Sequence, residues 1–148
     1  MTGWLLDTNV VSELKRPRPS SKVVAFIAEK ALNQLFLSVI TIAEIRFGIE
    51  RLNDAARRSD LGLWLDDGLR GMFDGRILPV GEDVLLRWRL IIEDGRQRGY
   101  TFSHPDVLIA ATAAHHGLTV ATRNVKEFVA AGVAVDDPWT GKTAAVRR

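Results

Sequence analysis

Short apolar runs alternate along this chain with longer segments whose apolar residues recur at helical spacing. The runs lie at residues 5–6, 35–37, 77–80, 119–121 and, more weakly, 133–135. Strands separated by helix-length connections are typical of a parallel sheet, because parallel neighbours need a long crossover between them. The pattern therefore predicts an α/β fold in which a short central parallel β-sheet of four to five strands is flanked by helices.

Three amphipathic segments are the clearest predicted helices, at residues 82–98, 54–73 and 20–30. The first of them has acidic side chains in its first turn and arginines in its last, as the helix dipole favours. Each segment places a set of apolar residues on one face. The three sets are Val84, Leu85, Trp88, Ile91 and Ile92; Leu61, Trp64, Leu65 and Leu69; and Val23, Val24, Phe26 and Ile27.

The composition is that of an ordinary globular protein and excludes several kinds of chemistry. The chain has 148 residues, of which 47% are hydrophobic and 26% charged, and its net charge of +2 does not by itself indicate nucleic acid. It has no cysteine, which excludes disulfides, thiol nucleophiles and cysteine-ligated metals. No apolar run approaches the roughly 18 residues of a membrane span, and the N-terminus lacks a signal-peptide pattern. We therefore expect a cytoplasmic protein with no membrane partner.

The sequence contains no feature that marks a boundary between domains. No linker, repeat or low-complexity tract interrupts residues 1–142, so we expect them to form a single domain. Residues 143–148 are basic and lack an apolar pattern, which predicts a loose C-terminal tail.

Three carboxylates lie where a predicted strand gives way to a predicted helix. Asp7 ends the first apolar run, and Glu44 follows the second by a few residues. Asp106 opens the helical segment 105–113. Ligands of open α/β sheets bind outside the carboxyl ends of the strands, so one fold can bring the three acids to the same edge. Clustered negative charge is costly unless a divalent cation occupies it, and the pattern therefore indicates metal-dependent chemistry.

Each of these acids also has an explanation that needs no metal. Thr41 to Glu44 and Ser103 to Asp106 both have the spacing of a capping box. Asp7 suits the N-cap of the helix that follows it. The two explanations are compatible, because a carboxylate that caps a helix keeps lone pairs for a cation.

Small residues accompany two of the acids. Gly48 lies one helical turn beyond Glu44, and Ala110 lies one turn beyond Asp106. Small side chains at these positions leave room for a bulky polyanion beside a metal, and they equally suit close packing of helices.

Four sequence blocks extend the argument beyond single residues. They are LLDTNVVSEL at 5–14, SVITIAEI at 38–45, DVLIAATA at 106–113 and TRNVKEF at 122–128. In this order the blocks resemble the signature of PIN-domain ribonucleases, most closely the VapC and FitB type of toxin from bacterial toxin–antitoxin pairs. The resemblance implies a PIN-like fold with an acidic metal-binding pocket. It matches Asp7, Glu44 and Asp106 to the three main catalytic and metal-binding acids of the family.

Asn124 departs from the family pattern, since many PIN domains have an aspartate at this position. An amide oxygen can coordinate Mg²⁺ but brings no charge, so Asn124 is expected to be a weak metal ligand. The negative charge of three carboxylates does not balance the positive charge of two divalent ions. We therefore expect one firm Mg²⁺ or Mn²⁺ site and a second that fills only when phosphate oxygens arrive. Asn124 also suits the N-cap of a short helix in which Glu127 completes a capping box.

The resemblance implies a metal-dependent endoribonuclease that hydrolyses RNA with a metal-activated water. Thr8, Asn9 and Thr122 are expected to hydrogen-bond the ligating carboxylates, with turn and helix-start roles as the alternative. Arg46 and Arg123 flank the acidic blocks, which makes them candidates for binding RNA phosphates, although solvated surface also explains them.

The resemblance also implies partners and a biological role. Proteins of this type usually form homodimers and are held inactive by a small antitoxin of the VapB or FitA type, so the chain is expected to be a growth-inhibiting toxin. A second hypothesis, which Asn124 favours, is a catalytically weak PIN-like protein that acts in a regulatory DNA-binding complex with its antitoxin. A third is a phosphatase with Asp7 as nucleophile, although Asn9 stands where such enzymes usually have a second acid.

Overall fold

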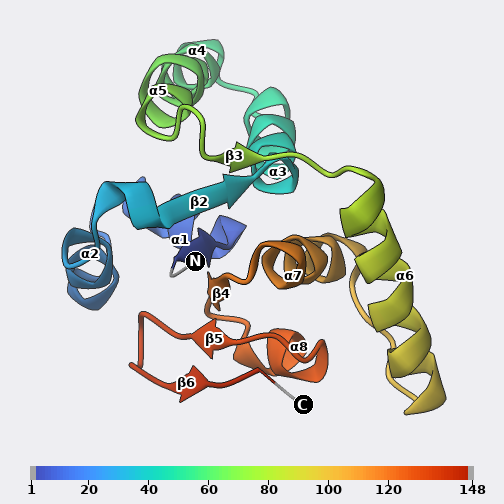
Figure 1. Ribbon diagram of the computed structural model, residues 1–148. Coiled ribbons are helices and arrows are strands. Elements are labelled where there is room, and N and C mark those ends of the chain that lie inside the picture. The colour runs from blue at the N-terminus through green and yellow to red at the C-terminus, as the bar shows by residue number, and fades with distance from the viewer. Residues whose placement is uncertain (1–2, 147–148) are drawn as a thin grey trace.

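The structure, a computed structural model, describes residues 3–146 and contains a six-stranded sheet in the order β3-β2-β1-β4-β5-β6 (Figure 1). All neighbouring strands are parallel except β5 and β6, which are antiparallel. The predicted α/β class is therefore confirmed, with one antiparallel edge strand beyond the predicted parallel sheet. The strands are β1 (Trp4–Leu6), β2 (Leu35–Ser38), β3 (Ile77–Leu78), β4 (Thr119–Ala121), β5 (Val135–Asp136) and β6 (Thr143–Ala144).

Helices connect these strands and cover both faces of the sheet. A 3₁₀ turn at Leu32–Gln34 precedes β2, and a π-helical turn at Trp64–Leu69 joins two α-helices. No helix within the described residues is both long and apolar enough to cross a membrane. The α-helices are α1 (Thr8–Leu14), α2 (Ser21–Ala28), α3 (Val39–Glu50), α4 (Ala55–Leu63), α5 (Arg70–Met72), α6 (Glu82–Gln97), α7 (His104–His116) and α8 (Val125–Ala130).

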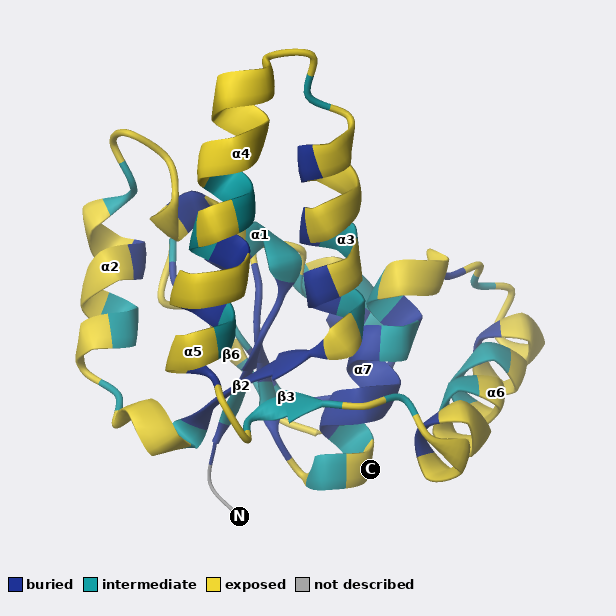
Figure 2. Ribbon diagram, turned by 90° about the horizontal axis from the view of Figure 1, so that it is seen from above, coloured by how far each residue is buried: buried dark blue, intermediate teal, exposed yellow. Residues whose placement is uncertain are grey.

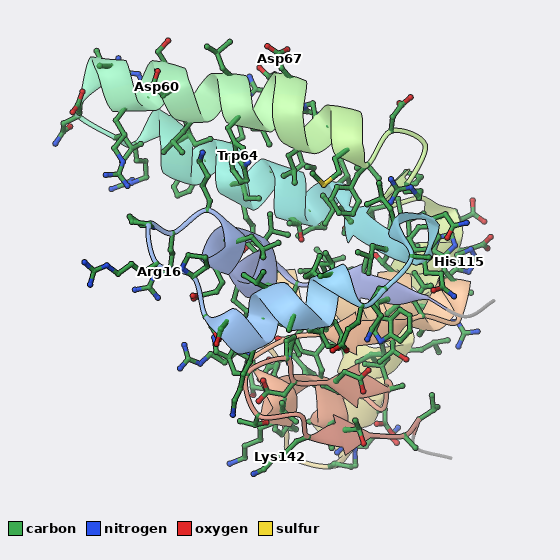
Figure 3. The ribbon with its side chains drawn as sticks, turned by 90° about the vertical axis from the view of Figure 1, so that its left-hand side faces the viewer. Arg16, Asp60, Trp64, Asp67, His115 and Lys142 are labelled. Atoms are coloured by element: carbon green, nitrogen blue, oxygen red, sulfur yellow. The ribbon has the colours of Figure 1, made fainter. Side chains whose placement is uncertain are left out.

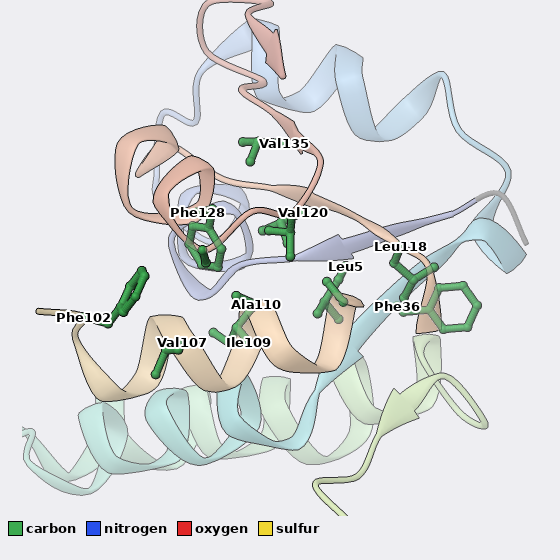
Figure 4. Close-up of a cluster of buried hydrophobic side chains, with 13 residues drawn as sticks. Leu5, Phe36, Phe102, Val107, Ile109, Ala110, Leu118, Val120, Phe128 and Val135 are labelled. Carbon is green, nitrogen blue, oxygen red and sulfur yellow. The ribbon is translucent and has the colours of Figure 1, made fainter. Parts of the chain in front are cut away.

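Two hydrophobic clusters lie on opposite faces of the sheet, because successive strand side chains point to opposite sides. Leu5 belongs to the cluster formed with α7 and α8, which is drawn in Figure 4. Leu6 belongs to the second cluster, with α1, α2, α3 and the π-helical turn. Phe36 and Leu37 of β2 divide in the same way. Strands that are buried on both faces appear in the sequence as continuous apolar runs, which explains the pattern that predicted them.

Helix α6 lies to one side of this core and packs against α7 rather than against the sheet (Figure 2). The helix predicted at residues 82–98 is confirmed, but its buried stripe is narrower than predicted. Val84 is buried, whereas Leu85 is 43% exposed. Because α7 is the main packing partner of α6, the outer leucine of the predicted face remains in solvent. Val24 of α2 is likewise exposed.

Three predicted boundaries differ from the structure. The helix predicted at residues 54–73 is divided by the π-helical turn. Strand β3 ends at Leu78, before Pro79, whose nitrogen cannot donate a hydrogen bond to a neighbouring strand. The fifth strand begins at Val135, two residues after the start of the predicted run at 133–135.

The predicted C-terminal tail begins with residues that pair in the sheet. Thr143 and Ala144, which fall at the start of the predicted loose tail, pair with Asp136 and Val135. Residues 147–148 of that tail lie outside the described residues. The division into a domain at 1–142 and a tail at 143–148 stays a prediction, although the first two tail residues belong to the sheet.

Candidate active site

Asp7 lies at the carboxyl end of β1, where the chain turns directly into α1. Its backbone N–H donates to the carbonyl of Ala121 at 2.9 Å, which continues the pairing between β1 and β4. Its Oδ1 accepts the backbone N–H of Thr8 at 2.8 Å, so the predicted N-cap is confirmed. The side chain is only 3% exposed, which makes Asp7 a buried carboxylate in a fixed orientation.

Thr122 meets the other oxygen of this carboxylate. It follows β4 directly, and because Leu6 pairs with Ala121, it lies beside Asp7. The fully buried Thr122 hydroxyl donates to Asp7 Oδ2 at 2.7 Å. The Asn9 side-chain amide lies 3.3 Å from the same oxygen and 3.3 Å from Thr122 Oγ1. The predicted hydrogen bonds from Thr122 and Asn9 to this carboxylate are therefore present.

The surroundings of Asp7 disfavour its charged form. Burial is the largest cause and raises its pKa from 3.8 to about 6, while hydrogen bonds from Thr122 and Thr8 act in the opposite direction. The negative charges of Asp106 and Glu44 raise the pKa further. Asp106 and Glu44 thus each lie within electrostatic reach of Asp7 at this edge of the sheet.

Glu44 projects from α3 and is held by a threonine of α1. The Thr8 hydroxyl donates to Glu44 Oε1 at 2.7 Å, and the hydroxyls of Thr8 and Thr41 are 3.1 Å apart. The predicted capping box from Thr41 to Glu44 is wrong, because both residues lie inside α3. Ser38 is the N-cap instead, and its hydroxyl accepts the Ile40 N–H at 3.0 Å. Strand β2 passes into α3 without a loop, so the helix begins earlier than the box requires.

Thr41 therefore lies beside the candidate site, although its spacing from Glu44 predicted a capping role. It is fully buried and lies three residues before Glu44, on the same side of α3. Its hydroxyl supports Thr8, which in turn orients the Glu44 carboxylate. A polar β-branched residue one turn before a candidate ligand was the signal available in the sequence.

Asp106 lies in the first turn of α7 and is half-buried. The Asn124 side-chain amide donates to its Oδ2 at 2.7 Å. Burial is the main cause that raises the pKa of Asp106, and the negative charge of Glu127 adds to it. Asn124 occupies the N-cap position of α8 as predicted, yet its side chain makes no capping hydrogen bond. Asn124 instead orients Asp106.

Glu127 joins the start of α7 to α8. Its Oε1 accepts the backbone N–H of Ser103 at 2.7 Å, and its Oε2 accepts the Tyr100 hydroxyl at 2.9 Å. The capping box predicted between Asn124 and Glu127 is therefore wrong, and the Ser103 side chain likewise makes no capping hydrogen bond. Both carboxylate oxygens of Glu127 contact residues more than 20 positions earlier in the chain, a pairing that local spacing does not predict.

Comparison with known proteins identifies the fold around these acids. The family profile described as PIN domain matches residues 4–132. The chain belongs to the PIN domain family. Its relatives include Toxin FitB of Neisseria gonorrhoeae, 42% identical over 91% of this chain and 97% of the relative. Another is VapC ribonuclease Y4jK of Sinorhizobium fredii, 36% identical over 91% of this chain and 96% of that protein.

Solved structures agree with this assignment. The crystal structure of FitAcB from Neisseria gonorrhoeae has a TM-score of 0.89 and 42% identity, and the match covers 93% of this chain and 99% of that chain. DNA-bound VapBC from Salmonella typhimurium has a TM-score of 0.76 at 21% identity, covering 93% and 99% of the two chains, and supports the fold alone. The predicted PIN fold is confirmed.

The oxygen atoms of this PIN site suit a hard divalent cation that keeps part of its water shell. Asp7, Glu44 and Asp106 offer carboxylate oxygens, and Asn124 offers an amide oxygen. Within residues 3–146, no three acidic or histidine side chains are arranged to enclose a metal ion directly. Mg²⁺ usually binds proteins through one or two carboxylates and retains several waters, so a closed cage is not required. The raised pKa of buried Asp7 fits a site in which a cation offsets the charge.

The two arginines predicted to bind phosphates have different surroundings. Arg46 is exposed and forms an ion pair with Glu50 on the outer side of α3, with Nε and Oε1 3.0 Å apart. The Arg123 guanidinium lies 5.2 Å from the centre of the Trp139 ring, and its backbone N–H donates to Asn9 Oδ1 at 3.3 Å. Arg123 is thus anchored beside the carboxylates, whereas Arg46 is tied to its own helix. A role of either residue in RNA binding remains a prediction.

Proposed function

We propose that this protein is a Mg²⁺- or Mn²⁺-dependent endoribonuclease that acts in the cytoplasm as the growth-inhibiting toxin of a toxin–antitoxin pair. The observation that carries the proposal is the buried Asp7 carboxylate, whose pKa is raised by burial and by the charges of Asp106 and Glu44. Relatives named Toxin FitB and VapC ribonuclease support the toxin role and the reaction class.

In this proposal Asp7, Glu44 and Asp106 hold the cation, with Asn124 as a weak additional ligand. When bound, the ion lowers the pKa of a coordinated water and neutralises charge on the phosphodiester. The protein's own contribution is orientation. Thr122 and the Thr8 backbone fix the Asp7 carboxylate.

The other two acids are oriented by hydrogen bonds of their own. The Thr8 hydroxyl directs Glu44, and the Asn124 amide directs Asp106. Fixed carboxylates bind a cation without losing side-chain entropy at that moment, which is the usual effect of such supporting contacts. Arg123, anchored on Trp139 beside the site, is placed to meet an RNA phosphate.

The proposed partners are an antitoxin and a second copy of the chain. Structural relatives described as FitAB and as VapBC toxin–antitoxin complexes support a small antitoxin of the VapB or FitA type. A basic side chain from such a partner would pair with the exposed oxygens of Asp106 or Glu44 and block the cation and the RNA together. A homodimer remains part of the proposal.

The test compares wild-type protein with Asp7→Asn and with Glu93→Gln, a matched change of a carboxylate paired with Arg96 on the surface of α6. Purified, partner-free protein is incubated with Mn²⁺ and mixed cellular RNA, and growth inhibition is scored in parallel. We expect Asp7→Asn to lower cleavage by about 100-fold or more and to abolish toxicity, because it removes a charged ligand. Glu93→Gln is expected to behave as wild type. Full activity in Asp7→Asn would reject the proposal.

A second candidate function is supported by Asn124, which brings an amide rather than a charge to Asp106. In that case the chain is a catalytically weak protein that binds RNA or acts with an antitoxin on DNA. It predicts that wild-type protein retains RNA in the presence of Mn²⁺ without cutting it. The phosphatase alternative loses support, because the Asn9 amide lies within hydrogen-bonding distance of Asp7 where a second acid would be needed.

A further inference from the structure

A groove of about 440 Å³ leads away from the acidic site between α1, α3 and α4. Thr8 and Glu44 line the end nearest the carboxylates. Gly48 lies further along α3, and Trp64 belongs to the π-helical turn that faces α1. The groove is therefore continuous with the proposed catalytic site and extends beyond it.

The far end of the groove is basic. Lys15, Arg16 and Arg57 line it, and the Lys15 ammonium lies 5.5 Å from the centre of the Trp64 ring. Figure 3 shows Trp64 and Arg16 on the same side of the molecule, from the upper helix and from the loop after α1. Arg16 is already paired with Glu13 at 3.3 Å. Lys15 and Arg57 are thus the cations best placed to meet a ligand in the groove.

Gly48 keeps the middle of the groove open. A side chain built at this position would meet no atom within 4 Å, so the glycine is not explained by close helix packing. Ala110, the other small residue near the acids, is fully buried in the core, and there the packing explanation holds. Of the two small residues, only Gly48 leaves space beside the site.

This arrangement fits a polyanion that extends past the cleavage site. A phosphate at the acidic end needs a cation beside it, whereas phosphates further along meet Lys15 and Arg57 directly. An aromatic ring beside a basic track is the usual combination in proteins that bind single-stranded nucleic acid, because every base can stack. A neutral or basic peptide would gain nothing from the two cations, whereas the phosphates of a nucleic acid would pair with both.

We propose that this groove holds the single-stranded RNA on one side of the cleaved bond, with Lys15 and Arg57 contacting its phosphates and Trp64 forming the wall beside a base. The inference rests on the proposed ribonuclease function and adds to it a defined binding track. It assigns to Gly48 the role of leaving that track unobstructed.

The first test measures binding without cleavage. A fluorescent single-stranded RNA of about 12 nucleotides is titrated against Asp7→Asn protein at several salt concentrations. Adding Lys15→Glu and Arg57→Glu is expected to weaken binding by about 10-fold and to reduce the salt slope by about 1.4, the value for two phosphate contacts. The matched control adds Arg87→Glu and Arg89→Glu on α6, which change the net charge equally. It is expected to alter affinity by less than about 2-fold, because charges far from the track are screened.

The second test obstructs the groove without touching the carboxylates. Gly48→Leu is compared with Gly71→Leu, since both glycines are exposed near a helix end and have open space around them. With the same RNA and otherwise wild-type protein, Gly48→Leu is expected to raise KM by about 10-fold or more while Gly71→Leu leaves it unchanged. A dinucleotide substrate, too short to reach Gly48, is expected to be cleaved equally by both variants.

The outcomes separate this inference from the proposed function. If wild-type protein cleaves RNA but the groove variants bind and cleave like their controls, the groove is not an RNA track, and a segment of a partner protein is its better occupant. If wild-type protein cleaves no RNA and Asp7→Asn protein binds none, both the inference and the ribonuclease proposal fail.

Discussion

The two halves of the acidic site are built in different ways. Asp7 is held by the sheet, through the pairing of β1 with β4 and the buried Thr122 hydroxyl. Asp106 is held by the starts of two helices, through the Asn124 amide, while Glu127 ties those helix starts together. The first half is nearly inaccessible and the second is half in solvent. The charged form is therefore strongly disfavoured by burial at Asp7. At Asp106, which is half in solvent, the same effect is weaker because water still contacts the carboxylate.

The largest expected consequence concerns stability. Neutralising Asp7 by Asp7→Asn should stabilise metal-free protein at pH 8 by up to about 3 kcal/mol, the cost implied by a pKa raised from 3.8 to about 6. Asp106→Asn should stabilise it less, because Asp106 is only half-buried. Urea unfolding of both variants measures the difference. Equal effects at the two positions would remove the contrast between the two halves.

The same shift sets the pH dependence of stability. The folded state holds the Asp7 proton more tightly than the unfolded chain does. The stabilisation that comes from this tighter proton binding is therefore present below pH 4 and is lost as pH rises through about 6. Without metal, the difference in unfolding free energy between wild type and Asp7→Asn should therefore grow from pH 4 to pH 7. A Mn²⁺-induced rise in Tm should be larger at pH 7.5 than at pH 5 in wild type and absent in Asp7→Asn. A difference independent of pH would show that Asp7 is not the group responsible.

Removing the hydroxyl that fixes Asp7 tests the half of the site that is held by the sheet. Thr122→Val should lower RNA cleavage and Mn²⁺ affinity by about 10- to 100-fold, because Asp7 loses its shortest side-chain hydrogen bond. Thr112→Val is the matched control, since Thr112 is also fully buried but its hydroxyl donates to the Leu108 carbonyl within α7. Single-turnover cleavage and metal titration are the measurements. Comparable losses in both variants would indicate a general packing defect.

Adding a negative charge to the half of the site around Asp106 has a smaller expected effect. Asn124→Asp should raise Mn²⁺ affinity by about 10-fold, because a carboxylate binds a hard cation better than an amide does. Asn124 is exposed, so the added charge should cost little stability without metal. Calorimetric metal titration measures the gain. Unchanged affinity would place Asn124 outside the cation site and leave it only the role of orienting Asp106.

The smallest expected effect is at Glu127. Glu127→Gln keeps the length of the side chain but removes the charge that raises the pKa of Asp106. Mn²⁺ affinity should change by less than about 5-fold, whereas Glu127→Ala, which also breaks the links to Ser103 and Tyr100, should reduce it further. If the two variants behave alike, the bridge between α7 and α8 does not position Asp106.

The sequence by itself determined the features that depend on neighbouring residues. The apolar runs predicted the parallel strands, because both faces of the central strands β1, β2 and β4 are buried. The N-cap at Asp7 was predictable, because a capping carboxylate binds the backbone that immediately follows it. The order of the four sequence blocks was enough to indicate the PIN fold.

Only the tertiary structure decided which distant residues meet. Thr41 has the spacing of a cap, yet it supports Thr8 because α1 and α3 pack together. Glu127 binds Ser103 and Tyr100 rather than its own helix start. The open space at Gly48 likewise depends on where α4 lies relative to α3. Local sequence preferences do not predict these contacts, because hydrogen-bond partners and grooves are set by the packing of segments far apart in the chain.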